Sequence, residues 1–305
     1  MRFSSGAPSN ALLLAASNIP TLDELSVKAR RWQGPQLSAF SHFTHLRRLG
    51  LFVGKWPHSG TIYYDQMSEL LNVQAYLRVL APQLFELEIS GDICELSTLV
   101  SNSWPHLRSL TMSGHGTTWT QAALTTAVAR MPSLRKLHMN LAAPCKGPWQ
   151  QPSAFIYSSP NHASPVRLPE VLPHLESLAL SNVHTPSDTI LDQLPDCLVC
   201  LHVLANYDYI RSYDPQTYLL WPRRYPLSEP DAFRIVQHTA RMKALTELML
   251  SLDFLPTVQL VRAIAASSPH LRVLQLEYTR YNERIPRTEH VSSLVCTHTL
   301  PNSLF

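Results

Sequence analysis

Cys197 and Cys200 are the residues of this sequence whose spacing comes nearest to that of a chemical site. Two cysteines separated by two residues hold zinc or undergo reversible oxidation in many proteins. A structural zinc site needs two further ligands, and neither a second cysteine pair nor a histidine pair lies at a suitable distance. The pair also falls inside a repeated phrase, described below, in which it flanks Leu198. We therefore interpret both cysteines as structural.

The 14 histidines invite a metal hypothesis. Three of them, His106, His174 and His270, occupy the same position of a sequence repeat, immediately before its first leucine. Their recurrence therefore follows from the repeat and does not indicate a metal site. Histidines on adjacent units would lie about 5 Å apart and point the same way, so we expect no convergence on one ion. His115 lies between two glycines directly after a predicted strand, a place where catalytic sites often occur. A turn formed by the two flexible glycines explains this segment as well as a catalytic site does. The motifs of phosphate-binding loops, zinc proteases and serine hydrolases are absent. The sequence thus predicts no catalytic, cofactor-binding or metal-binding residue, and a protein that is not an enzyme.

The surroundings of these residues are set by the phrase Pro-x-Leu-x-x-Leu-x-Leu, which recurs along the whole chain. Its second and third apolar residues alternate with polar ones, as in a strand with one buried face. Strands of successive units pair into a parallel sheet, and each unit buries its leucines against its neighbours. We expect Leu110, Leu137 and Leu178 to be buried in this way. The phrases begin at Leu22, Leu46, Leu84, Leu107, Leu134, Leu175, Leu198, Leu245 and Leu271, and a tenth begins near Leu300.

The segments between the phrases carry apolar residues at helical spacing. An alternation of strand and helix along the whole chain indicates the α/β class. The sequence predicts a leucine-rich repeat solenoid, a horseshoe with a parallel concave sheet, helices on the convex side, and nine to ten irregular repeats. The predicted helices span residues 10–17, 65–80, 120–131, 186–194, 228–242 and 256–267.

The phrase, the helical returns and the irregular unit lengths resemble the ribonuclease-inhibitor-like class of leucine-rich repeat proteins. The Pro-His-Leu variant and the long insertions are most similar to fungal leucine-rich repeat proteins associated with an F-box. The resemblance covers about residues 10–305, and no F-box is visible. We expect a single repeat domain over residues 1–305, truncated at both ends. The resemblance implies that the chain recognises substrates for a ubiquitin ligase, and that a ligase adaptor binds only if a longer form carries an F-box.

The composition disfavours several classes of partner. Lys and Arg number 25 against 22 Asp and Glu, and a net charge of +3 is too small to argue for nucleic acid. No apolar run reaches the length of a membrane span. Residues 11–16 are apolar but short for a secretion signal, and we interpret them as core helix rather than a cryptic signal. Five scattered cysteines fit a reducing compartment. We expect a cytoplasmic or nuclear protein without cofactors that binds neither nucleic acid nor membrane.

The outward positions of the strands form one candidate surface for a protein or peptide partner, because the concave face is the usual binding surface of a solenoid. These positions lie between and just after the inward leucines. They are Glu24, Ser26, Lys28, Arg48, Gly50, Phe52, Glu86, Glu88, Ser90, Ser109, Thr111, Ser113, Lys136, His138, Asn140, Ser177, Ala179, Ser181, Cys200, His202, Leu204, Glu247, Met249, Ser251, Val273, Gln275 and Glu277.

Two insertions, residues 142–172 and 205–230, form the second candidate surface. Both leave the sheet directly after a strand. The first is rich in proline and carries Trp149, Phe155 and Tyr157, and the second carries several Tyr with Trp221 and three Arg. Tyr, Trp and Arg dominate interface hot spots. The alternative is that the aromatic side chains pack each long loop onto the solenoid. The predicted partner-binding residues are Phe52, Lys136, His138, His202, Tyr207, Tyr209, Tyr213, Tyr218, Trp221, Arg223 and Arg224.

Two other functions stay open at this stage. One is a structural or regulatory scaffold of the ribonuclease-inhibitor-like class that is unrelated to ubiquitin. The other is an enzyme that uses the cysteine and histidine groups, which stoichiometric zinc in the pure protein would support.

Overall fold

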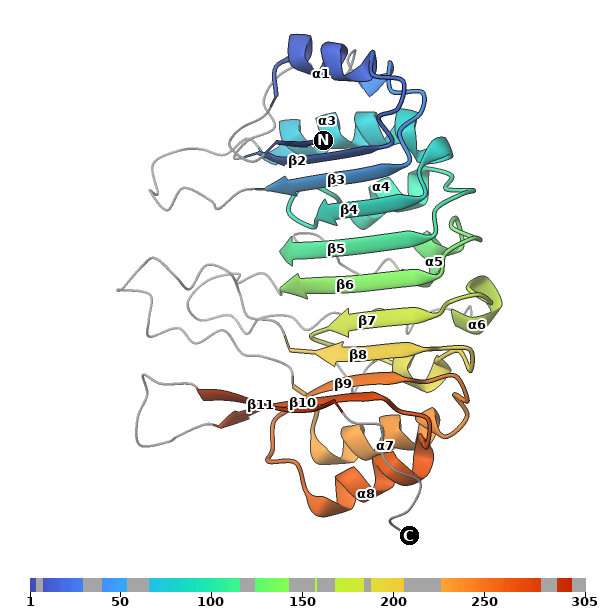
Figure 1. The fold of residues 1–305 in the computed structure, drawn as a ribbon, viewed down its shortest axis with the longest axis vertical. Helices are drawn as coiled ribbons and strands as arrows, with labels where there is room; N and C mark the ends of the chain where they lie inside the picture. The colour runs from blue at the N-terminus through green and yellow to red at the C-terminus, as the bar shows by residue number, and fades with distance from the viewer. Residues whose placement is uncertain are drawn as a thin grey trace.

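The computed structural model of the chain describes residues 1–3, 8–29, 40–53, 66–115, 124–142, 157, 168–183, 188–205, 226–280 and 290–297. These residues form one sheet and the helices that connect its strands (Figure 1). Most of both insertions lies outside the described residues.

The strands lie side by side in sequence order, as Figure 1 shows along its vertical axis. Every pair from β1–β2 to β9–β10 is parallel, whereas β11 runs antiparallel to β10. The sheet does not close on itself among the described residues. This topology confirms the predicted α/β solenoid. The strands are β1 (Arg2–Phe3), β2 (Glu24–Ala29), β3 (Arg48–Val53), β4 (Glu86–Ser90), β5 (Ser109–His115), β6 (Lys136–Ala142), β7 (Ser177–Ser181), β8 (Cys200–Leu204), β9 (Glu247–Leu252), β10 (Val273–Arg280) and β11 (His290–Thr297).

The strand register aligns the second leucine of every phrase across the sheet. Leu110, for example, pairs with Leu87 on one side and Leu137 on the other. From β2 to β9 each of these leucines is at most 2% exposed, because it packs against its copies in the neighbouring units. The ladder consists of Leu25, Leu49, Leu87, Leu110, Leu137, Leu178, Leu201, Leu248 and the partly buried Leu274.

The helices form a second layer that follows the sheet. Neighbouring helices contact one another, as α4 does α5 and α7 does α8. No described helix crosses in front of the strands in Figure 1, so the helices cover one face of the sheet and leave the other uncovered by helix. The helices are α1 (Asn10–Ser17), α3 (Gln66–Leu80), α4 (Leu96–Ser101), α5 (Leu124–Val128), α6 (Leu168–Val171), α7 (Glu229–Thr239) and α8 (Val258–Ser267), with 3-10 helices η1 (Ala81–Gln83) and η2 (Ile190–Gln193).

The helix starts follow from local capping. Ser228 accepts a hydrogen bond from the Asp231 N–H at the start of α7, and Thr257 accepts one from the Leu260 N–H at the start of α8. Each such cap contributes about 1 kcal/mol because it satisfies a backbone N–H that the helix leaves unpaired. These caps explain why the predicted helices 228–242 and 256–267 begin where they do.

The predicted helices agree with the structure in place more than in length. The segment 10–17 is helical over its whole length as α1. The described helix of segment 120–131 is the shorter α5, and segment 186–194 yields a 3-10 helix rather than an α-helix. The sequence did not predict the helices α4 and α6, because they are too short to show a helical period. It did not predict the edge strand β11, because this strand lacks the repeated phrase. The tenth repeat expected near Leu300 lies outside the described residues. None of the described helices is long and apolar enough to cross a membrane.

Candidate functional site: the outward face of the sheet

The outward face of the sheet, opposite the leucine ladder, carries two continuous rows of side chains. The strand register places the first two predicted outward positions of each phrase in these rows, which supports the predicted frame of alternation. The prediction was wrong for three of the third positions: Ser90, Ser181 and Ser251 are buried, and the Ser181 hydroxyl donates to the Met139 and Leu141 carbonyl oxygens. The first row is Glu24, Arg48, Glu86, Ser109, Lys136, Ser177, Cys200, Glu247 and Val273. The second row is Ser26, Gly50, Glu88, Thr111, His138, Ala179, His202, Met249 and Gln275.

The two rows change character along the sheet. Over β2 to β4 they are ionic: Arg48 lies 2.9 Å from Asp23 and 3.6 Å from Glu24. The hydrogen bond and the charge of Asp23 raise the pKa of the Arg48 guanidinium, so this end of the face stays charged. Over β6 to β9 the rows hold two histidines, a cysteine and a methionine, with Lys136 and Glu247 as the charged groups. The second part is the chemically richer one.

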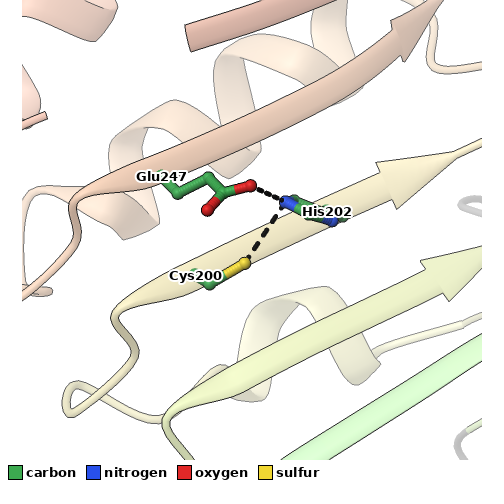
Figure 2. A group of neighbouring side chains, drawn as sticks. All are labelled: Cys200, His202 and Glu247. Atoms are coloured by element: carbon green, nitrogen blue, oxygen red, sulfur yellow. Dashed lines mark hydrogen bonds and ion pairs between the residues drawn. The ribbon is translucent and has the colours of Figure 1, made fainter. Parts of the chain in front are cut away.

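Cys200, His202 and Glu247 meet on this second part (Figure 2). Cys200 and His202 are two residues apart on β8 and so project from the same side of the strand, while Glu247 is the register partner of Cys200 on β9. The Nε2 atom of His202 lies 3.2 Å from the Cys200 Sγ and 2.8 Å from a Glu247 carboxylate oxygen. The His202 side chain is 17% exposed and that of Glu247 42%, so solvent reaches the group. We name these three residues the Cys-His-Glu cluster.

The Cys200 thiol is protonated at neutral pH. Burial raises its pKa above the ordinary value, Glu247 raises it further, and a hydrogen bond from Ser177 and the charge of Lys136 oppose this only in part. The thiolate is the nucleophilic form of cysteine. A thiol with a raised pKa is therefore poorly suited to nucleophilic catalysis.

His138 lies beside the cluster and is neutral at physiological pH. Burial is the largest cause that lowers its pKa, and together with the neighbouring Lys136 and His202 it brings the pKa to about 4. Its Nε2 atom lies 2.8 Å from the Ser177 Oγ, and its ring centroid is 6.1 Å from that of His202. The two histidines stand on β6 and β8, about 10 Å apart at the backbone. Their rings approach because the strand between them offers only Ala179, which is 1% exposed.

Of the residues predicted to bind a partner, the structure brings together Lys136, His138 and His202. Phe52 is half-buried on β3, separated from them by intervening strands, and a side chain at Gly50 would overlap its ring. The remaining predicted residues lie outside the described part of the chain: Tyr207, Tyr209, Tyr213, Tyr218, Trp221, Arg223 and Arg224.

The two cysteines of the predicted structural pair have different surroundings. Cys197 is exposed in the turn before β8, where its Sγ lies 3.2 Å from the Leu175 carbonyl oxygen. Cys200 faces His202 instead. Cys197 and Cys200 are both free thiols. The two thiols have separate partners, and the interpretation of both cysteines as structural stays a prediction.

Sequence reasoning missed the meeting of Cys200 with His202 and Glu247. It placed all three residues on the outward face but expected no histidine to converge with other ligand-type side chains. That expectation compared only histidines of adjacent units. It did not consider Glu247, the partner of Cys200 on the next strand. The signal was present: Cys-x-His on one strand, and a glutamate at the same row position of the next phrase.

Tyr157 shows how the first insertion attaches to the sheet. Its hydroxyl donates to the Ser181 carbonyl oxygen at 2.7 Å, and its backbone N–H donates to the Asp188 carboxylate. Its carbonyl accepts from the Leu124 N–H at 3.1 Å. Burial raises the pKa of this phenol, which stays neutral. For this aromatic residue, packing of the loop onto the solenoid is the observed role.

No protein-family model and no curated protein matches this chain. Its likeness to leucine-rich repeat proteins therefore rests on the repeated phrase and on the parallel sheet that alternates with helices.

Proposed function

We propose that this chain is a non-catalytic protein-interaction scaffold that binds a protein or peptide on the outward face of its sheet. The observation that carries the proposal is the contrast between the two faces. The leucines of the ladder are buried, whereas most first-row and second-row side chains from β5 to β9 remain partly accessible. The open face of a solenoid is its usual binding surface.

The chemistry of the rows favours a protein over a nucleic acid. Between β5 and β9 the rows hold one lysine, and the remaining side chains are small, neutral or apolar apart from Glu247. Phosphate backbones require many Lys and Arg contacts. His138 and His202 beside Met249 suit a mixed polar and apolar protein surface better.

The finer proposal is that the chain is the substrate-recognition part of an F-box-type ubiquitin ligase component. It rests on the resemblance of the phrase, the Pro-His-Leu variant and the insertions to fungal F-box-associated proteins. The alternative is a ribonuclease-inhibitor-like binding scaffold unrelated to ubiquitination. The transcript that encodes the chain separates them: an in-frame F-box upstream of Met1 supports the first, and an in-frame stop codon directly upstream supports the second.

The second insertion contributes the aromatic hot spot in this proposal. We expect the triple change of Tyr207, Tyr218 and Trp221 to alanine to abolish recovery of the partner when the tagged chain is cross-linked in its native extract. Truncation of a central aromatic anchor costs about 2 kcal/mol or more. The readout is the set of cross-linked proteins identified by mass spectrometry.

The matched control for that experiment is Tyr157→Phe, which removes an aromatic hydroxyl that the structure assigns to packing. It should leave partner recovery unchanged. Recovery of the same partner by the triple variant would contradict the role of the insertion, and recovery of no specific partner by the unaltered chain would contradict the scaffold itself.

A further inference from the structure

We infer that Cys200, His202 and Glu247 form a zinc site with three protein ligands and a fourth position open to the outward face. The proposal goes beyond the binding of a protein partner and does not depend on it. It rests on the positions of the three side chains, on their hydrogen bonding and on the chemistry of their ligand atoms.

The ligand atoms are already close to the spacing of a tetrahedral zinc site. All three lie within 4.8 Å of one another. Tetrahedral bonds to zinc place sulfur and nitrogen about 3.6 Å apart, and nitrogen and oxygen about 3.4 Å apart. The observed separations at His202 Nε2 are 3.2 Å and 2.8 Å. The Cys200 and Glu247 atoms would each move away from His202 Nε2 by about half an ångström to reach tetrahedral spacing, while their own separation stays within 4.8 Å.

One ring nitrogen of His202 cannot make an ordinary hydrogen bond of the same kind to both of its neighbours, although Ser177 also hydrogen-bonds the Cys200 thiol. The Nε2 atom of His202 faces both Cys200 and Glu247, as Figure 2 shows by its two dashed lines. If Nε2 carries a proton it donates to Glu247 and cannot accept from the thiol. If it is bare it accepts from the thiol and turns a lone pair toward the carboxylate. A cation that takes lone pairs from all three atoms resolves this conflict.

The ligand set selects zinc over the harder divalent cations. Thiolate, imidazole and carboxylate are the three protein ligand types of Zn²⁺, whereas Ca²⁺ and Mg²⁺ are bound by oxygen. A Cys200 thiolate and the Glu247 carboxylate together neutralise the two charges of the ion. Lys136 is the nearby positive charge that opposes binding, and it acts on the Cys200 thiol from the neighbouring part of the first row.

The scaffold holds the ligands without a loop. Cys200 and His202 come from one strand, and Glu247 comes from its hydrogen-bonded neighbour. Sites on regular elements are held more accurately than sites on loops. Three protein ligands leave the fourth tetrahedral position to water or to a side chain of a partner, as in zinc sites that exchange ligands.

The test is the zinc content of the full chain after loading with Zn²⁺ and exhaustive dialysis. We expect about one bound zinc per chain. Cys200→Ser and His202→Gln should each weaken zinc binding by more than the about 10- to 100-fold that loss of an outer-shell partner costs. Cys197→Ser is the matched control, because this exposed thiol lies three residues away and outside the cluster, and it should retain zinc.

Glu247→Gln tests the zinc site even if Cys200→Ser and His202→Gln fold poorly. The side chain is 42% exposed and its replacement is nearly isosteric, so folding is preserved. Loss of zinc from this variant at unchanged circular dichroism supports the site. Equal zinc content in the unaltered chain, Cys200→Ser and Glu247→Gln would overturn it, since the retained ion then binds elsewhere. Absence of zinc from the unaltered chain would overturn it equally.

Cobalt substitution and proton release give a second readout. Co²⁺ bound at the cluster should show a thiolate-to-cobalt absorption band that is present in Cys197→Ser and absent from Cys200→Ser. Because a coordinating thiol must lose its proton, zinc binding at neutral pH should release about one proton per chain. A cobalt band that persists in Cys200→Ser would contradict the assignment of Cys200 as the sulfur ligand.

Discussion

Replacement of Leu110 by alanine should lower the free energy of unfolding by about 2–5 kcal/mol, the range measured when a buried leucine is truncated and its cavity is only partly refilled. Leu110 is 0% exposed and stands in the leucine ladder between Leu87 and Leu137. A cavity at this rung disturbs the packing of both neighbouring units. Leu137→Ala and Leu178→Ala should behave in the same way. Denaturant titration followed by circular dichroism measures the effect.

Thr111→Ala is the internal control, because Thr111 follows Leu110 on the same strand and faces outward. The Thr111 hydroxyl has no hydrogen-bond partner in the described structure, so its removal should cost well under about 1 kcal/mol. Equal losses of unfolding free energy at Leu110 and Thr111 would contradict the alternation on which the two faces are based.

Asp188→Ala should destabilise the protein by roughly 3 kcal/mol or more. Asp188 is 2% exposed and accepts hydrogen bonds from the backbone N–H groups of Tyr157 and Ile190. Each hydrogen bond to a charged group contributes about 1.5–3 kcal/mol. Truncation of the Asp188 side chain leaves both backbone N–H donors buried without an acceptor. The change should also release the contact between the first insertion and the sheet. Denaturant titration measures the stability, and limited proteolysis within residues 142–172 measures the release.

Asp192→Ala is the matched control for Asp188. Asp192 belongs to the neighbouring 3-10 helix, and its partly exposed carboxylate lies 3.6 Å from Arg234 and 3.3 Å from His238. Ion pairs of this kind contribute about 0–1 kcal/mol. A loss at Asp192 as large as that at Asp188 would contradict the anchoring role, as would unchanged proteolysis of Asp188→Ala.

The repeated phrase was sufficient to predict the parallel strands β2 to β10, but not the edge strands β1 and β11. Its period of two predicts which leucines turn inward, and its recurrence predicts parallel pairing in sequence order. The first two predicted outward positions of each phrase fall into continuous rows for the same reason. Lengths of helices were less predictable: α4 and α6 span about one or two turns, too few for a helical period to emerge.

The candidate site was predictable only in part. The frame placed Cys200, His202 and Glu247 on one face, but whether they touch depends on side-chain reach across two strands. Ala179 adds a second unpredicted effect, since its small side chain lets the rings of His138 and His202 approach over the intervening strand. Such cross-strand contacts join residues of different units, separated by an insertion of variable length. A pattern within one unit cannot reveal them.

The dissociation constant of the captured partner measures whether the outward face of the sheet binds it. The face variant combines Lys136→Glu with Met249→Asp. The control is Arg262→Glu, which makes the same charge change as Lys136→Glu at an exposed residue of α8 on the helix layer. The face variant should raise the dissociation constant about 10-fold or more, equivalent to about 1.4 kcal/mol, and the control should leave it unchanged. Equal affinity of the face variant and the unaltered chain, or a loss of affinity confined to Arg262→Glu, would contradict the proposed binding face.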